Sequence, residues 1–232
     1  MSEYILKHGC EIPMFTRILK ELFGYKTDGF FVEFGVGGCK NTGSNTADLA
    51  DLGWQGVYVE PNHDHYLECV DRHKNNNVKV FECAAGNSYE DLTLEGDTTH
   101  SEVFEAFDKL GWYPPRGDKP GTLMPPATVK QMPVQDILIQ ANVPNKFDLW
   151  SIDVEGAELT ILKSTNFTKW RPTLIILETR HRDPHFINSF PDLVNNSVEC
   201  ITLLQNNGYR VVLEDHQNAL LVSDPIGGAV FK

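Results

Sequence analysis

The chain has 232 residues, 41% of them hydrophobic and 22% charged. These values are typical of one globular domain with a substantial core. A formal net charge of −12 disfavours non-specific binding to nucleic acid, which requires a basic field. No apolar run approaches the roughly 18 residues of a membrane-spanning helix, and no secretory apolar segment follows the N-terminus. The five cysteines form no C-x-x-C pair and no metal-binding spacing, so we expect reduced thiols in a cytoplasmic protein.

The hydrophobic pattern predicts alternating helices and strands. The expected helices are an amphipathic N-terminal helix at 11–23 and others at about 44–53, 63–74, 134–141, 156–164 and 192–207. The expected strands are at about 30–35, 57–60, 78–83, 147–153, 173–178, 209–213 and 219–222. The last two strands are joined by a short polar turn and should pair antiparallel. The pattern therefore predicts an α/β fold with a mixed seven-stranded, mostly parallel sheet flanked by helices.

One segment breaks this alternation. Between Gly86 and Pro126 the pattern is irregular, apart from a short predicted helix at about 101–110. A segment this long inside a compact domain is usually functional or disordered. We therefore expect a single domain, 1–232, that carries a lid or substrate-binding insertion at about 87–127. Trp112 and Tyr113 in this insertion would stack on a sugar or hold the insertion in place.

The stretch from Phe30 to Glu60 reads as a strand, a glycine turn, a helix and a second strand that ends in a carboxylate. Such a unit forms a nucleoside-binding crevice at the carboxyl edge of a parallel sheet. A dinucleotide site needs G-x-G-x-x-G, and the third glycine is absent from Gly35-Val36-Gly37-Gly38-Cys39-Lys40. S-adenosylmethionine sites use an acidic residue before a G-x-G, as Glu33 is here, and a carboxylate that ends the second strand. Glu60 is that carboxylate, and it could accept both ribose hydroxyls. The unit therefore favours S-adenosylmethionine over a dinucleotide.

The segments FVEFGVGG, SNTADLADLGWQGVYVEPN, FECAAG, DLWSIDVEGAELTIL and LIILET resemble the FkbM-type methyltransferase family. The resemblance covers about 30–86 and 128–180, and its most specific element is the block from Asp153 to Glu158. It implies the class I, Rossmann-like methyltransferase fold and an S-adenosylmethionine-dependent O-methyltransferase acting on sugar or polyketide hydroxyls. The stretch 87–127 and the chain beyond Arg180 match weakly, and substrate identity would lie there.

Carried over by position, the resemblance implies cofactor-binding roles along four loops. Gly35 and Gly37 would pass beneath the methionine part of the cofactor, and Glu60 would hold its ribose. The remaining candidates are Glu33, Ser44, Asn45, Thr46, Asn62, Ala84, Ala85 and Asp153. The polar group 44–46 would meet the cofactor carboxylate at a helix N-terminus, and the two alanines would lie by the adenine. Ser44 could instead serve only as a helix N-cap.

Methyl transfer to a hydroxyl needs a group that accepts the hydroxyl proton. Candidates follow the fourth and fifth strands of the sheet: Asp153, Glu155, Glu178 and His181. We favour Asp153 or His181 as the base. Asp153, Glu178 and His181 also form a set that suits Mg²⁺ or Mn²⁺ holding a sugar diol. Glu155 and Glu158 could instead only favour the positive end of the next helix.

The leading hypothesis is methylation of a sugar or glycoside hydroxyl, with a metal as a possible aid. A nucleic-acid, cap-type methyltransferase is a second hypothesis, disfavoured by the negative charge and by the absence of a K-D-K-E tetrad. A third is a non-catalytic module of a larger glycan-synthesis enzyme, tethered to a glycosyltransferase. Arg180 and Arg182 are candidates for a basic patch, although paired surface arginines are usually only solvated.

Overall fold

The computed structural model describes residues 10, 12–37, 39, 43–94 and 127–224. Its helices are α1 (Phe15–Phe23), α2 (Ala47–Asp51), α3 (His63–Arg72), α5 (Val134–Gln140), α6 (Glu158–Lys163), α7 (Pro184–Ser189) and α8 (Pro191–Asn206). Its strands are β1 (Phe30–Phe34), β2 (Gln55–Val59), β3 (Val78–Phe81), β4 (Ala84–Gly86), β5 (Asp91–Leu94), β6 (Ala127–Pro133), β7 (Lys146–Ile152), β8 (Arg171–Glu178), β9 (Tyr209–Glu214) and β10 (Asn218–Ser223).

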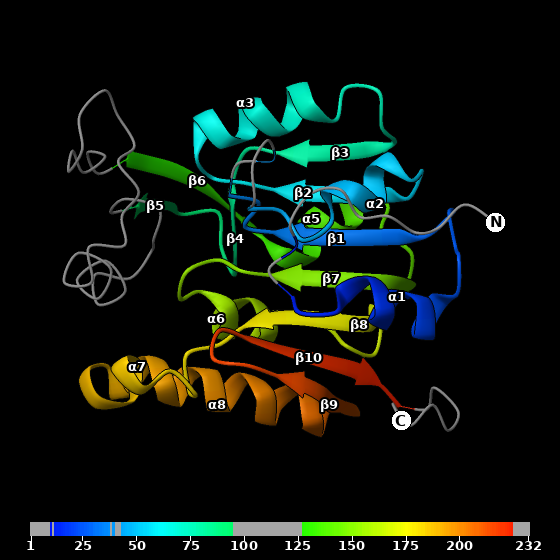
Figure 1. The fold of residues 1–232 in the computed structure, drawn as a ribbon. Coiled ribbons are helices and arrows are strands. Elements are labelled where there is room, and N and C mark those ends of the chain that lie inside the picture. The colour runs from blue at the N-terminus through cyan, green and yellow to red at the C-terminus, as the bar shows by residue number, and fades with distance from the viewer. Residues whose placement is uncertain (1–9, 11, 38, 40–42, 95–126, 225–232) are drawn as a thin grey trace, which may run out of the picture.

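Seven strands form the central sheet in the order β3-β2-β1-β7-β8-β10-β9. β3, β2, β1, β7 and β8 pair in parallel, whereas β10 pairs antiparallel with both β8 and β9. Figure 1 shows β10 pointing opposite to β7. The expected mixed seven-stranded sheet is therefore confirmed.

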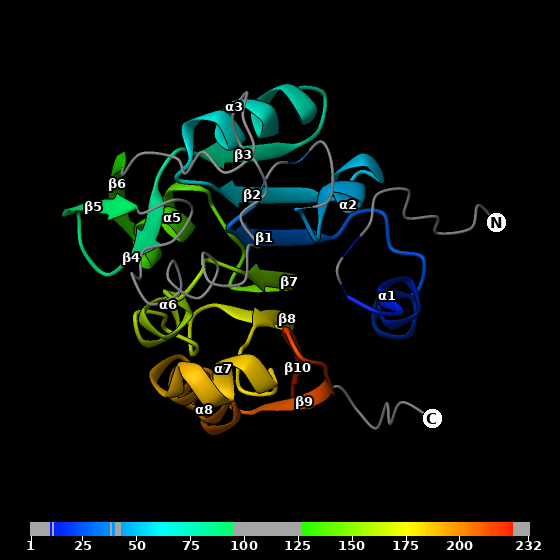
Figure 2. The same ribbon diagram turned by 60° about the vertical axis from the view of Figure 1, so that its left-hand side comes forward.

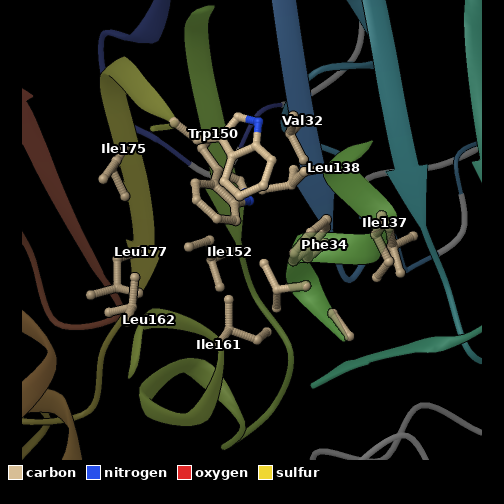
Figure 3. Close-up of a cluster of buried hydrophobic side chains, with 14 of the residues drawn as sticks. Val32, Phe34, Ile137, Leu138, Trp150, Ile152, Ile161, Leu162, Ile175 and Leu177 are labelled. Carbon is tan, nitrogen blue, oxygen red and sulfur yellow. The ribbon is translucent and has the colours of Figure 1, made fainter. Parts of the chain in front are cut away.

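Helices cover both faces of this sheet, because side chains alternate between the two faces along each strand. On one face Val32, Phe34, Trp150 and Ile152 pack with residues of α5, α6 and α8, as Figure 3 shows in part. The opposite face carries the alternate strand residues, including Phe31 and Leu149, and packs against α1, α2 and α3. The sheet is therefore buried between two layers of helices.

A second, three-stranded sheet has the order β4-β6-β5 and lies beyond the carboxyl ends of the central strands (Figures 1 and 2). The sequence pattern did not predict it. Asp91–Leu94 falls inside the expected insertion 87–127 but pairs antiparallel with the start of β6. Residues 95–126, including the predicted helix at 101–110 and the Trp112–Tyr113 pair, lie outside the described residues.

The N-terminal helix is shorter than expected. α1 begins at Phe15 rather than at residue 11, because Met14 has a left-handed φ of 59° that ends the helix on its N-terminal side. α7 was not predicted at all. Among the described residues, none of the helices is long and apolar enough to cross a membrane.

Candidate functional site

The candidate site lies at the carboxyl edge of the central sheet. Sheet order places β1 between β2 and β7, with β8 next to β7. The residues that follow these parallel strands therefore adjoin at one edge, where ligands bind in open α/β sheets. The predicted site residues Gly35, Glu60, Asp153 and Glu178 all fall at these strand ends.

Gly35 allows β1 and β7 to approach closely where both strands end. It has a left-handed φ of 76°, and a Cβ atom placed there would lie 1.5 Å from the Asp153 carbonyl oxygen. Its amide donates to the Val59 carbonyl, while the Asp153 amide donates to the Phe34 carbonyl. The glycine is thus required by the fold of the site, whatever the site binds.

Glu33 is buried on the face of the sheet that α1–α3 cover, and it organises the segment before α2. Its carboxylate accepts hydrogen bonds from the Ser44 and Thr46 hydroxyls, both at 2.6 Å, and from the Asn45 amide at 2.7 Å. Burial raises the pKa of Glu33 to about 7, against the effect of these bonds. These contacts delay the start of α2 until Ala47. Direct contact of Ser44, Asn45 or Thr46 with a cofactor stays a prediction.

Glu60 joins the end of β2 to the glycine turn. Its Oε2 accepts from the Val36 and Gly37 amides at 3.0 and 3.1 Å, and its Oε1 accepts from the Asn62 amide at 2.8 Å. Its side chain is 5% exposed, and His65 Nδ1 lies 3.8 Å from Oε1. Burial raises the pKa of Glu60. A buried carboxylate therefore faces the turn where the cofactor is predicted.

The other predicted cofactor contacts have structural roles in the described protein. Asn62 caps α3, its side-chain oxygen accepting from the Asp64 and His65 amides. Ala84 and Ala85 are buried in β4, which pairs with β6. Contact of these three residues with a cofactor stays a prediction.

Three carboxylates converge where β7 and β8 end. One oxygen each of Asp153, Glu158 and Glu178 lies within 4.8 Å of the other two. Glu158 accepts from the Val154 and Gly156 amides and so closes the turn before its own helix. Burial raises the pKa of Glu178 well above its usual range, and Asp153 and Glu158 add to the shift. This shift favours the neutral form of Glu178.

Arg180 partly neutralises this cluster. Its guanidinium contacts Glu178 and lies 3.3 Å from Glu155 Oε2. Glu155 reaches it from a left-handed backbone conformation, φ 53°. Burial opposes the charge of Arg180, but the surrounding carboxylates outweigh it and raise its pKa.

The expectation of a solvated arginine pair is wrong for Arg180, which is 8% exposed and packs 5.0 Å from the Phe186 ring. Only Arg182 is exposed. A small pocket beside Arg180 is lined by Glu155, Gly156, Glu158, Glu178, Leu193, Asn196, Ser197 and Cys200. The signal in the sequence was an arginine two residues after the carboxylate that ends a strongly apolar strand.

His181 lies apart from the three carboxylates. Its Nε2 is 3.3 Å from Glu214 Oε1, at the end of β9, and its buried Nδ1 has no hydrogen-bond partner among the described residues. In the described structure Glu158, rather than His181, groups with Asp153 and Glu178. A role for His181 as base or metal ligand stays a prediction.

The structure also gathers three residues that were not predicted to act together: Cys39, Cys69 and His73. The sequence shows no metal-binding spacing among the cysteines, but the fold brings two of them together with a histidine. Cys69 and His73 are four residues apart, so they share one side of α3. This spacing was the available signal, and Cys39 could not be placed beside it from sequence.

Residues 35–211 match a model of the methyltransferase FkbM domain. A search of curated proteins found no match. Similar solved structures include an O-methyltransferase from Bacillus cereus in complex with SAH (14% identity, 92% of this chain and 83% of that one, TM-score 0.48). Others are a putative O-methyltransferase from Klebsiella pneumoniae (13%, 92% and 81%, 0.49) and Aeropyrum pernix fibrillarin with S-adenosyl-L-methionine (11%, 88% and 70%, 0.43). With its central sheet of class I methyltransferase topology and a domain match over most of its length, the chain belongs to the FkbM methyltransferase family.

Proposed function

We propose that this protein is an S-adenosylmethionine-dependent O-methyltransferase whose acceptor is a hydroxyl of a sugar or glycoside. The observation that carries the proposal is the position of the Glu60 carboxylate. It ends β2, is buried, and lies against the glycine turn that follows β1. A methyltransferase domain with a carboxylate at this point has the group needed to accept ribose hydroxyls.

The residues at this edge fit an adenosine-bearing cofactor. A carboxylate offers about four lone-pair positions. Glu60 uses three of them on the Val36, Gly37 and Asn62 amides, two on Oε2 and one on Oε1. Oε1 is therefore the oxygen open to a ribose hydroxyl, and a second hydroxyl would replace an amide of the turn. Gly35 and Gly37 adopt a positive φ that favours glycine, and without side chains they leave the backbone of the turn uncovered.

Asp153 is the base that we propose. When bound, S-adenosylmethionine would supply the methyl group for transfer to the acceptor oxygen, and the Asp153 carboxylate would accept the hydroxyl proton. Glu178 shares a hydrogen bond with Asp153, and burial raises the pKa of Glu178 well above its usual range. Arg180 stabilises the ionised form of the cluster. Orientation of the acceptor against the cofactor can supply about 7–11 kcal/mol of the barrier.

A divalent cation is a further element of the proposal. Asp153, Glu158 and Glu178 present the oxygen ligands that Mg²⁺ or Mn²⁺ prefers, and a bound cation would polarise an acceptor hydroxyl. Glu158 takes the third position that was predicted for His181. Arg180 already contacts Glu178, so a cation would compete with the guanidinium for that carboxylate.

The acceptor class rests on the family resemblance, and a net charge of −12 disfavours a nucleic-acid acceptor. A cytoplasmic location and tethering to a glycosyltransferase stay predictions from the sequence.

The experiment is a panel of sugar and glycoside acceptors with a methyl-labelled donor, with and without EDTA. We expect label in at least one acceptor at a hydroxyl oxygen. Loss of transfer with EDTA, restored by Mg²⁺ or Mn²⁺, would support metal assistance. Calorimetry with S-adenosylhomocysteine separates the alternatives: no heat of binding would contradict the cofactor assignment, whereas binding without transfer would contradict the acceptor class.

A further inference from the structure

Two cysteines and a histidine meet on the α1–α3 side of the sheet, away from the carboxylate cluster. Cys39 follows the glycine turn after β1, Cys69 lies on α3, and His73 follows directly after α3. We propose that Cys39, Cys69 and His73 bind one Zn²⁺ ion. The site does not depend on the proposed methyl-transfer function.

The three side chains are close enough to share one ion. Both Sγ atoms and a ring nitrogen of His73 lie within 4.8 Å of one another. In tetrahedral zinc, Zn–S bonds of about 2.3 Å place two sulfurs about 3.8 Å apart, so shifts of about 1 Å or less complete the geometry. Cys39, Cys69 and His73 are 3%, 0% and 3% exposed, which shields an ion from competing solvent.

The orientation of His73 is an independent observation. Its buried Nε2 has no hydrogen-bond partner among the described residues. Its Nδ1 lies 3.3 Å from Asn76 Oδ1. Asn76 is itself fixed, because its Nδ2 donates to the Ala50 carbonyl at 2.8 Å. Asn76 Oδ1 therefore accepts from Nδ1–H, which leaves the lone pair on Nε2. This arrangement is the usual outer support of a metal-binding histidine.

The charge balance of the site also favours Zn²⁺. Zinc binding displaces both thiol protons to solvent, and two thiolates with Zn²⁺ sum to zero charge. A neutral centre can be buried at low cost, whereas a thiolate pair alone cannot. Soft thiolates with imidazole select zinc or Cu⁺ over Mg²⁺.

The ion would link the segment that follows β1 to helix α3. Cys39 comes two residues after Gly37, whose amide contacts Glu60. Cys69 lies on the helix that Asn62 caps beside that carboxylate, and His73 follows this helix directly. The described residues supply three ligands, and water would take the fourth position of a Cys₂His site.

The test is metal binding by the full chain, reduced and freed of metal before titration. We expect one Zn²⁺ per chain in competition with a chromophoric chelator. We also expect thiolate-to-metal charge-transfer absorption when Co²⁺ replaces zinc. The substitutions Cys69→Ser and His73→Gln should weaken zinc binding at least 100-fold, and Asn76→Ala by about 10–100-fold. The matched control is Cys200→Ser, because Cys200 is equally buried but lies outside the cluster.

The wild-type titration decides the proposal even where a variant fails to fold. Substoichiometric zinc, or a Co²⁺ spectrum without thiolate bands, would overturn it. Stoichiometric Cu⁺ with zinc excluded would overturn the choice of ion. Unchanged affinity in a folded Cys69→Ser variant, or equal loss in Cys200→Ser, would overturn the ligand set.

Discussion

At the scale of single residues, Gly35 has the least room for a side chain among the described glycines that were compared. Its φ is 76°, and an added Cβ would lie 1.5 Å from a backbone oxygen, which cannot rotate away as a side chain can. We expect Gly35→Ala to destabilise the protein by at least about 2 kcal/mol in chemical denaturation. Gly24→Ala is the control, because Gly24 has a φ of 66° but nothing within 4 Å of its added Cβ. Equal losses of stability in the two variants would show that the positive φ alone, and not the contact with the backbone oxygen, causes the effect.

Glu33 should make stability depend on pH. Burial raises its pKa from 4.5 to about 7 in the folded protein, so its stabilising contribution is full below pH 4.5. That contribution is lost as pH rises through 7, by about 3 kcal/mol in all. In Glu33→Gln the side-chain amide can still form hydrogen bonds with the Ser44 and Thr46 hydroxyls, because a hydroxyl oxygen also accepts hydrogen bonds.

We therefore expect Glu33→Gln to lose less stability than the wild type between pH 4.5 and 8, measured by urea denaturation at each pH. Glu60 and Glu178 titrate in the same direction in both proteins, so the difference between the two curves reports on Glu33 alone. Parallel curves would contradict the assignment. Glu90→Gln, at an exposed site, should leave the wild-type curve unchanged.

Asp153 is the residue on which the proposed chemistry depends. Asp153→Asn should lower kcat by about 10²–10⁴-fold while cofactor affinity stays nearly unchanged, because the amide cannot accept the proton. Single-turnover methyl transfer at saturating cofactor measures this. Activity within about twofold of wild type would refute the role. Asp71→Asn, which alters an exposed pair with Lys74, is the control.

At the scale of elements, α3 depends on its N-cap. Asn62 accepts from two amides of the first turn, and its own amide donates to Glu60. Asn62→Ala should destabilise the protein by about 1 kcal/mol and weaken cofactor binding, whereas Asn62→Asp should keep both. Thermal melting and calorimetry measure the two effects. A stable Asn62→Ala variant with normal affinity would contradict the coupling of cap and crevice.

Elements were predictable where hydrophobic periodicity was long and regular. The seven central strands and most of their helices lie within a few residues of the expected bounds. The second sheet was missed because β4 has only three residues, too short for a periodic signal, and β5 lies within the irregular segment that follows Gly86. β6 mixes polar and apolar residues with a single buried one, Gln131, and is defined by its partners rather than by its own composition.

At the scale of the whole molecule, cofactor binding should stabilise the fold. A ligand that binds only the folded state adds about 2.7 kcal/mol at 100 times its Kd. For a chain of this length this is a rise in Tm of roughly 5–11 °C with S-adenosylhomocysteine. NAD should produce no shift. A shift with NAD alone would favour the dinucleotide site that the missing third glycine argued against.

The sequence by itself determined the sheet, the family and the strand ends that carry Glu60, Asp153 and Glu178, because periodicity and short motifs are local properties of the chain. Only the tertiary structure decided which side chains meet. In the structure Glu33 bonds to the segment 44–46, Arg180 is buried among carboxylates, and His181 lies beside Glu214. It also placed Cys39 beside Cys69 and His73. Such contacts link residues distant in the chain, and packing of helices on the sheet sets their distances, which no local pattern encodes.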